Sequence, residues 1–122
     1  MGHEFESLSS KIIEAAIDVH QKRGPGFLES IYENALKIAL RQRGLDFQFQ
    51  QEVRVRYEGE EVGLHRLDLI VQGQIVVDLK AIKDLEPVHF AQVRSYLKAT
   101  GIRVGLLFNF NAATLVIKRI VL

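Results

Sequence analysis

The sequence predicts an α/β fold in which a mixed central sheet is flanked by helices. Apolar residues recur at helical spacing in two early segments, residues 7–23 and 28–43. Alternating or continuous apolar runs then predict strands at residues 47–57, 62–71, 75–80, 104–108 and 114–121. A third helical segment, residues 87–100, separates the last two strands from the others. The predicted order is therefore helix, helix, three strands, helix, two strands.

Length and composition predict one compact domain over residues 1–122. The chain is 48% hydrophobic, which is enough for a sizeable core. Its 16 basic and 15 acidic residues give a net charge of +1, which excludes a strongly basic histone-like binder but allows a local basic patch. The absence of cysteine excludes disulfides and thiolate metal sites.

No targeting or membrane segment is recognisable in the sequence. The first ten residues, MGHEFESLSS, lack the basic-then-apolar order of a secretion signal. No apolar run approaches the ~20 residues that a membrane-spanning helix needs. We therefore expect a soluble, cytoplasmic protein that does not associate with membranes.

Each predicted helix has an expected start and an expected apolar stripe. Serines within residues 7–10 are expected to cap the first helix, and Pro87 suits the first turn of the third. On the second helix, Glu29 and Tyr32 lie one turn apart, beside the expected core stripe. The expected core residues are Leu8, Ile12, Ala15, Ala16 and Val19 on the first helix, Leu28, Ile31, Ala35 and Ile38 on the second, and Val88, Ala91 and Leu97 on the third.

The segment at residues 65–80, HRLDLIVQGQIVVDLK, is predicted to be a hairpin at the centre of the sheet. Charged residues, among them Asp68, Asp78 and Lys80, interrupt its apolar strands. Because side chains alternate along a strand, Asp78 and Lys80 share one face, opposite Leu79. Asp68, in the preceding strand, is expected to meet Asp78 across the ladder.

This arrangement suggests a divalent-metal site next to a phosphate. Mg²⁺ prefers oxygen ligands, which the two aspartates and the backbone carbonyl of Leu79 would supply. Lys80 would orient the attacking water or neutralise charge on the phosphoryl oxygens. On spacing alone, a surface ion pair between Asp78 and Lys80 is as good an interpretation as the metal site.

The third helix carries a polar stripe formed by His89, Gln92 and Tyr96, which recur at helical spacing. These side chains are candidates for contacting a phosphate or the attacking water. On spacing alone, a polar edge of a half-buried helix is the preferred interpretation. The glycine-rich Gly24-Pro25-Gly26 lacks the lysine and hydroxyl of a P-loop, so it is interpreted as a turn.

Several blocks resemble one known family. The stretch GFLESIY, residues 26–32, resembles the motif that names the GxxExxY proteins, small prokaryotic members of the PD-(D/E)XK nuclease superfamily. Similar blocks run along nearly the whole chain: IIEAAIDVHQKRGPGFLESIYENAL, RLDLIV, VVDLKAI, AQVRSYLKATG and VGLLFNF. The resemblance implies a restriction-endonuclease-like fold.

The resemblance also implies site residues. Asp68 resembles the metal-binding aspartate of the superfamily, and Asp78 with Lys80 resembles its (D/E)XK element. Glu29 resembles a helical glutamate that assists metal binding. Residues Gln92 and Tyr96 resemble the QxxxY motif of the RecB-like and lambda-exonuclease-like branches.

The implied activity is hydrolysis of phosphodiester bonds with Mg²⁺ or Mn²⁺, with DNA favoured over RNA. Relatives usually carry glutamate where this chain has Asp78, which is one methylene shorter and implies tighter metal geometry or weaker activity. The alternative is a catalytically weak or inactive nuclease-fold module that binds nucleic acid or a protein partner. Assembly into a homo-oligomer is left open.

Overall fold

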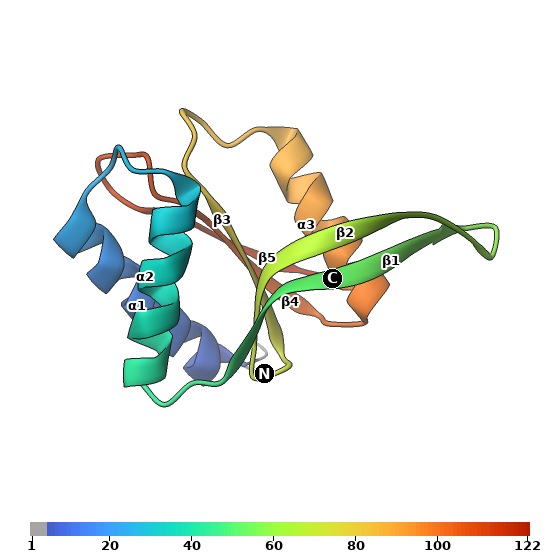
Figure 1. The fold of residues 1–122 in the computed structure, drawn as a ribbon, viewed down its shortest axis with the longest axis horizontal. Coiled ribbons are helices and arrows are strands. Elements are labelled where there is room, and N and C mark those ends of the chain that lie inside the picture. The colour runs from blue at the N-terminus through green and yellow to red at the C-terminus, as the bar shows by residue number, and fades with distance from the viewer. Residues whose placement is uncertain (1–4) are drawn as a thin grey trace.

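A computed structural model describes residues 5–122, and it contains three helices and a five-stranded sheet (Figure 1). The predicted order of elements and the predicted mixed sheet flanked by helices are both confirmed. Residues 1–4 of the predicted domain lie outside the described residues. The elements are α1 (Glu6–Arg23), α2 (Glu29–Gln42), β1 (Phe47–Tyr57), β2 (Glu60–Val71), β3 (Ile75–Lys80), α3 (Pro87–Thr100), β4 (Val104–Asn109) and β5 (Val116–Val121).

The sheet has the strand order β1-β2-β3-β4-β5. Only the β3–β4 pair is parallel, because α3 carries the chain back between these two strands. The other neighbours are antiparallel. In the part of the chain that is described, no helix is long and apolar enough to cross a membrane.

Helices cover both faces of the sheet (Figure 1). The helices α1 and α2 pack on one face against Val77 and Leu79 of β3, while α3 packs on the other face against Val76. Gly105 lets α3 approach closely, since a Cβ atom there would lie 2.7 Å from Val93 Cγ1. By alternation along β3, Asp78 is on the same face as Val76.

Three details of the predicted helices are wrong. The expected core stripe of α2 is largely exposed, with Leu28 at 73% and Ile38 at 52%, because the helix packs through the neighbouring stripe. That stripe contains a larger aromatic residue and consists of Tyr32, Leu36, Ala39 and Leu40. On α3, Val88 and Ala91 are exposed, whereas Val93 and Leu97 are buried. The residue at the N-cap of α1 is Phe5, which makes no side-chain cap, so no serine caps this helix.

The strands β1 and β2 continue beyond the sheet as a two-stranded arm, residues 51–66 (Figure 1). The strand β2 pairs with β3 only through residues 69–71, so the earlier part of β2 has β1 as its sole neighbour in the described sheet. Most arm residues are exposed. At the base of the arm, β1 contains Gln50, which has a φ of 49°, and β2 contains Asp68.

Candidate functional site

The candidate site lies where β2 and β3 separate. The last paired residues of this ladder are Leu69 and Val77. Two residues beyond Val77, the Leu79 N–H donates to Oδ2 of Asp68 over 2.8 Å, so a side-chain carboxylate replaces the backbone acceptor of a regular ladder. Because the N–H and C=O of a strand residue point toward the same neighbouring strand, the Leu79 carbonyl also points into this gap.

Asp78 is the most unusual residue of the site. It is only 4% exposed, and its Oδ2 atom has no hydrogen-bond partner among the described residues. Its Oδ1 atom lies 3.7 Å from Nζ of Lys80. Burial, followed by the hydrogen-bonding and repulsive effects of the neighbouring Asp68 carboxyl, raises the pKa of Asp78 to about 8. The raised pKa means that Asp78 holds its proton to a higher pH than an ordinary aspartate does.

Glu29 reaches the same region from the opposite layer. It is the first residue of α2, which begins at the end of the sheet where β3 ends (Figure 1). Burial raises the pKa of Glu29, and the negative charge of Asp68 raises it further, while Lys80 lowers it. The structure thus brings residues from α2, β2 and β3 within electrostatic reach of one another.

The aspartates form a pair and not a preassembled cage. Within residues 5–122, no three His, Cys, Asp or Glu side chains form a ready metal-binding cluster. The oxygens of Asp68 and Asp78 and the Leu79 carbonyl are nevertheless hard ligands of the kind that Mg²⁺ and Mn²⁺ take. The unpartnered, buried Oδ2 atom of Asp78 also fits a cation, because a buried acid without a partner costs free energy that a ligand would offset.

Two predicted residues approach the site from α3. Tyr96 is half-buried, and its ring packs edge-on against His65 with centroids 4.7 Å apart. Burial raises the pKa of Tyr96, and the charges of Asp78, Asp68 and Glu29 raise it further. Gln92 lies one turn earlier, is half-buried and makes no side-chain hydrogen bond to any described residue.

His89 has a structural role that its spacing did not indicate. Its Nδ1 atom accepts a hydrogen bond of 2.8 Å from the Glu86 N–H and completes a capping box at the start of α3. His89 therefore stabilises the start of α3, and its Nδ1 is already engaged by the backbone.

The sequence analysis missed the role of Tyr32 as an internal support. Its hydroxyl donates to the carbonyl of Gly24 over 2.6 Å and accepts the N–H of Phe27 over 3.2 Å. Its buried ring stacks on Phe110 with centroids 4.6 Å apart. Tyr32 thus holds the loop that precedes Glu29 against the core. The spacing of Glu29 and Tyr32 was visible in the sequence, but the direction of the ring was not.

A second support that the sequence analysis missed is Asn109 at the end of β4. It is 1% exposed, and its Oδ1 atom accepts the Ile82 N–H over 3.1 Å while its Nδ2 atom donates to the Ile82 carbonyl over 2.9 Å. It pairs in register with Lys80. Asn109 therefore fixes the backbone that directly follows Lys80. A buried asparagine ending an apolar strand was the available signal.

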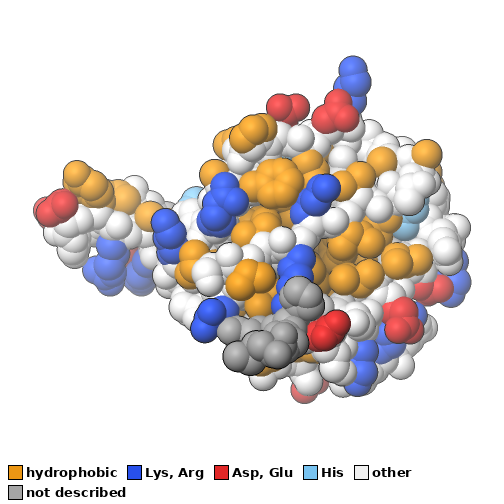
Figure 2. All heavy atoms as spheres, turned by 180° about the vertical axis from the view of Figure 1, so that it is seen from behind, with side chains coloured by type: hydrophobic (Ala, Val, Ile, Leu, Met, Phe, Trp, Pro, Cys, Tyr) orange, Lys and Arg blue, Asp and Glu red, His pale blue; other side chains and the backbone are white. Residues whose placement is uncertain are grey.

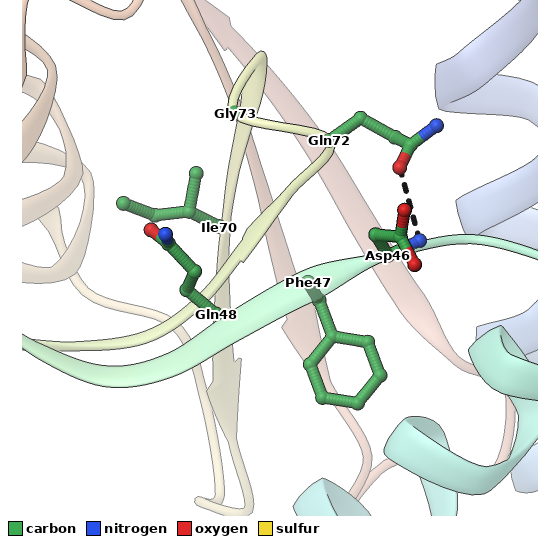
Figure 3. A pocket seen from close by; sticks show the side chains of 6 residues that line it. All are labelled: Asp46, Phe47, Gln48, Ile70, Gln72 and Gly73. Carbon is green, nitrogen blue, oxygen red and sulfur yellow. Dashed lines mark hydrogen bonds between the residues drawn. The ribbon is translucent and has the colours of Figure 1, made fainter.

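A separate pocket lies by the β2–β3 turn (Figure 3). Oε1 of Gln72 accepts the Asp46 N–H over 3.0 Å, and the Gln72 N–H donates to the Asp46 carbonyl over 2.9 Å. These bonds fasten the turn to the start of β1. The only charged residue lining the pocket is Asp46, so the lining offers no cation for a phosphate.

A comparison with protein families agrees with this geometry. The model of the PD-(D/E)XK nuclease superfamily matches residues 6–120, which includes all the residues of the candidate site. No curated protein and no solved structure matches the chain significantly. Nucleases of this superfamily generally use divalent metals and act on nucleic acids.

Proposed function

The chain belongs to the PD-(D/E)XK nuclease superfamily, and from this premise we propose that it is a Mg²⁺- or Mn²⁺-dependent nuclease that hydrolyses phosphodiester bonds in DNA. The narrower placement among the GxxExxY proteins, the single domain over residues 1–122 and the cytoplasmic location remain predictions.

The environment of Asp78 carries the proposal. A buried carboxyl that lies against a second carboxyl, with a lysine 3.7 Å away, is unfavourable for folding alone. Strongly shifted pKa values of this kind cluster at functional sites. An ordinary surface ion pair between Asp78 and Lys80 would not need a buried aspartate.

The metal ligands would come from the two sides of the strand gap. Asp68, Asp78 and the Leu79 carbonyl would hold the ion, and Glu29 would assist from the start of α2. When bound, the ion would polarise the phosphodiester and lower the pKa of the attacking water. Because the raised pKa of Asp78 favours its protonated form, ion binding would promote release of that proton.

Three further side chains would act directly on the phosphate or the water. The ammonium of Lys80, 3.7 Å from Asp78 Oδ1, would stabilise charge that develops on the phosphoryl oxygens or orient the water. The hydroxyl of Tyr96 stays protonated well above neutral pH, so it can donate a hydrogen bond. Gln92 has donors and an acceptor that no described residue occupies.

The test measures cleavage of linear, circular and single-stranded DNA with Mg²⁺, Mn²⁺ or EDTA. Lys80→Ala should lower the cleavage rate about 10²–10³-fold and leave most of the metal affinity, because the lysine does not bind the ion. Asp78→Asn should remove metal binding and cleavage together. Lys83→Ala, an exposed residue three positions further, is the matched control and should cleave as wild type does.

Equal cleavage by wild type and Lys80→Ala would mark the activity as a contaminant and contradict the assignment. Wild type that binds DNA without any metal-dependent cleavage would instead support the alternative, a nuclease-fold binding module. The shorter Asp78 in place of the usual glutamate is the sequence feature that makes this comparison informative.

A further inference from the structure

A basic groove runs between the arm and the C-terminal half of α3. It has a volume of about 420 Å³ and is lined by Arg54, Val55, Arg56, Ser95, Lys98 and Ala99. Figure 1 shows α3 passing beside the base of the arm, and Figure 2 shows Lys and Arg side chains gathered along the arm and on the adjoining body. We call it the arm groove.

The cations of α3 are not neutralised within the helix, whereas the arm carries its own acids, Glu52, Glu58, Glu60 and Glu61. The helix α3 contains no Asp or Glu, and its exposed Arg94 and Lys98 are four residues apart, a spacing at which like charges repel. Arg54 is paired with Glu61 at 2.6 Å. Within residues 5–122, neither Lys98 nor Arg56 forms an ion pair. An anionic partner would relieve this repulsion.

The groove is suited to phosphates and not to bases. None of its lining residues is aromatic, so it lacks the stacking surface that single-strand binders use. Arg54 and Arg56 lie on either side of the bulge that follows Val55 in β1, and both line the groove. Cations in a row without aromatic residues are typical of contacts to a nucleic-acid backbone.

The arm groove adjoins the carboxylate site through consecutive residues of α3. Ser95 lines the groove, and its Oγ atom lies 3.5 Å from Nε2 of His65. The ring of His65 packs on Tyr96, which is within electrostatic reach of Asp78. Ser95 of the groove and Tyr96 of the candidate site are consecutive residues of α3. A nucleic-acid backbone held in the groove would therefore pass next to the candidate site.

We propose that the arm groove binds the phosphate backbone of double-stranded DNA and leads it to the carboxylate site. A two-stranded ribbon fits the wide major groove of B-DNA, whereas the major groove of A-form RNA is too narrow for it. The role in delivering substrate rests on the proposed nuclease function, whereas the binding itself does not depend on it.

The test is fluorescence anisotropy with the full chain and a labelled DNA duplex of about 20 base pairs, in EDTA so that no cleavage occurs. Arg56→Ala/Lys98→Ala should weaken binding at least about tenfold and reduce the slope of log Kd against log salt by about 2. Arg56→Lys/Lys98→Arg retains both charges and should retain affinity. Lys11→Ala/Lys118→Ala removes two exposed charges elsewhere and is the matched control.

Each result supports or overturns the proposal. Loss of duplex affinity in the alanine pair but not in the control supports it, provided that both unfold at the wild-type temperature. Equal losses in both pairs, or tighter binding of single-stranded DNA or double-stranded RNA of the same length, would overturn it. If duplex binding depends on Arg56 and Lys98 while wild type never cleaves DNA with Mg²⁺, the proposed nuclease function is wrong. The proposal that the arm groove binds duplex DNA is then still supported.

Discussion

Asp78 is a buried acidic side chain in an environment that does not favour the folded state. Its carboxyl is taken from water without a hydrogen-bond partner for Oδ2, and the Lys80 ammonium is not in tight contact at 3.7 Å. Residues that act in binding or catalysis are commonly held in environments that do not favour folding. The raised pKa of Asp78 makes this cost depend on pH.

Replacing Asp78 by asparagine should change the pH dependence of stability. The folded-state pKa of Asp78, about 8, lies above the ordinary aspartate value of 3.8, so between these values the folded chain holds a proton that the unfolded chain has lost. Wild-type stability should therefore fall as pH rises through this window, by up to about 1.4 kcal/mol per pH unit. Asp78→Asn carries no titrating proton and should lose this slope.

Urea unfolding in EDTA at pH 5 and pH 8.5 measures the effect. The variant should gain stability relative to wild type at the higher pH. Lys83→Ala provides a control for general surface-charge effects. Parallel pH profiles for wild type and Asp78→Asn would show that Asp78 titrates normally and would contradict the described environment.

The spacing of these residues was readable in the sequence, but their environment was not. Strand alternation placed Asp78 and Lys80 on one face, and the hairpin placed Asp68 nearby. The bond from the Leu79 N–H to Asp68 depends on where β2 leaves β3, and this follows from the course of the arm. Such a departure is set by tertiary structure and leaves no period in the sequence.

At the scale of elements, the loop between α1 and α2 is held by one side chain. Tyr32 binds the backbone at Gly24 and Phe27, and the chain then enters α2 at Glu29. The loop itself contains the positive-φ glycines Gly24 and Gly26, which permit its turns but do not fix its position. The position of Glu29 therefore depends on the hydroxyl of Tyr32, which lies three residues further along α2.

Tyr32→Phe should keep the stacked ring and lose only these two hydrogen bonds. We expect the free energy of unfolding to fall by about 1–2 kcal/mol, because the Gly24 carbonyl and Phe27 N–H lose a partner. If Glu29 assists metal binding, the Mn²⁺ affinity of this variant should also shift toward that of Glu29→Gln. Chemical denaturation and calorimetric Mn²⁺ titration measure the two effects.

Tyr57→Phe is the matched control, because Tyr57 is 70% exposed and should tolerate the change. A Tyr32→Phe variant as stable as the control would mean that the hydroxyl is not needed to hold the loop. Reduced stability with unchanged Mn²⁺ affinity would separate the loop support from the proposed role of Glu29.

The helix α2 also shows why its buried face could not be predicted. Two adjacent apolar stripes both follow helical spacing, and periodicity ranks them equally. Packing selects the stripe with Tyr32, whose ring stacks on Phe110 in the segment after β4. On the same side, the buried pair of Lys37 and Glu33, 3.2 Å apart, brings Lys37 over the ring of Phe49. Such a polar contact inside the covered face cannot be read from a hydrophobic pattern.

At the scale of the molecule, a rigid sheet centre is joined to a thin arm. All residues of β4 and nearly all of β3 are buried between the helix layers. The arm contacts α3 near its base, through Val53 and His65, but its outer part is exposed, and an isolated two-stranded ribbon is only marginally stable in water. The strand pattern predicted β1 and β2, but their separation from the sheet depends on long-range packing that the sequence pattern does not record.

This contrast predicts two classes of backbone amide in hydrogen exchange. Amides of β3 and β4, which lie between helix layers, should exchange only through global unfolding. Amides in residues 56–64 should exchange orders of magnitude faster, because these residues are exposed and opening the end of the arm exposes little buried surface. Exchange followed by mass spectrometry on the full chain in EDTA distinguishes these segments.

Adding a DNA duplex of about 20 base pairs should slow exchange in the arm but not in β4, since β4 is already protected. Equal protection of the arm and β4 in the free protein would mean that the arm is held by contacts beyond its own ladder. An unchanged arm in the presence of bound duplex would place the DNA elsewhere, because a ribbon that binds phosphates through Arg56 loses its freedom to open.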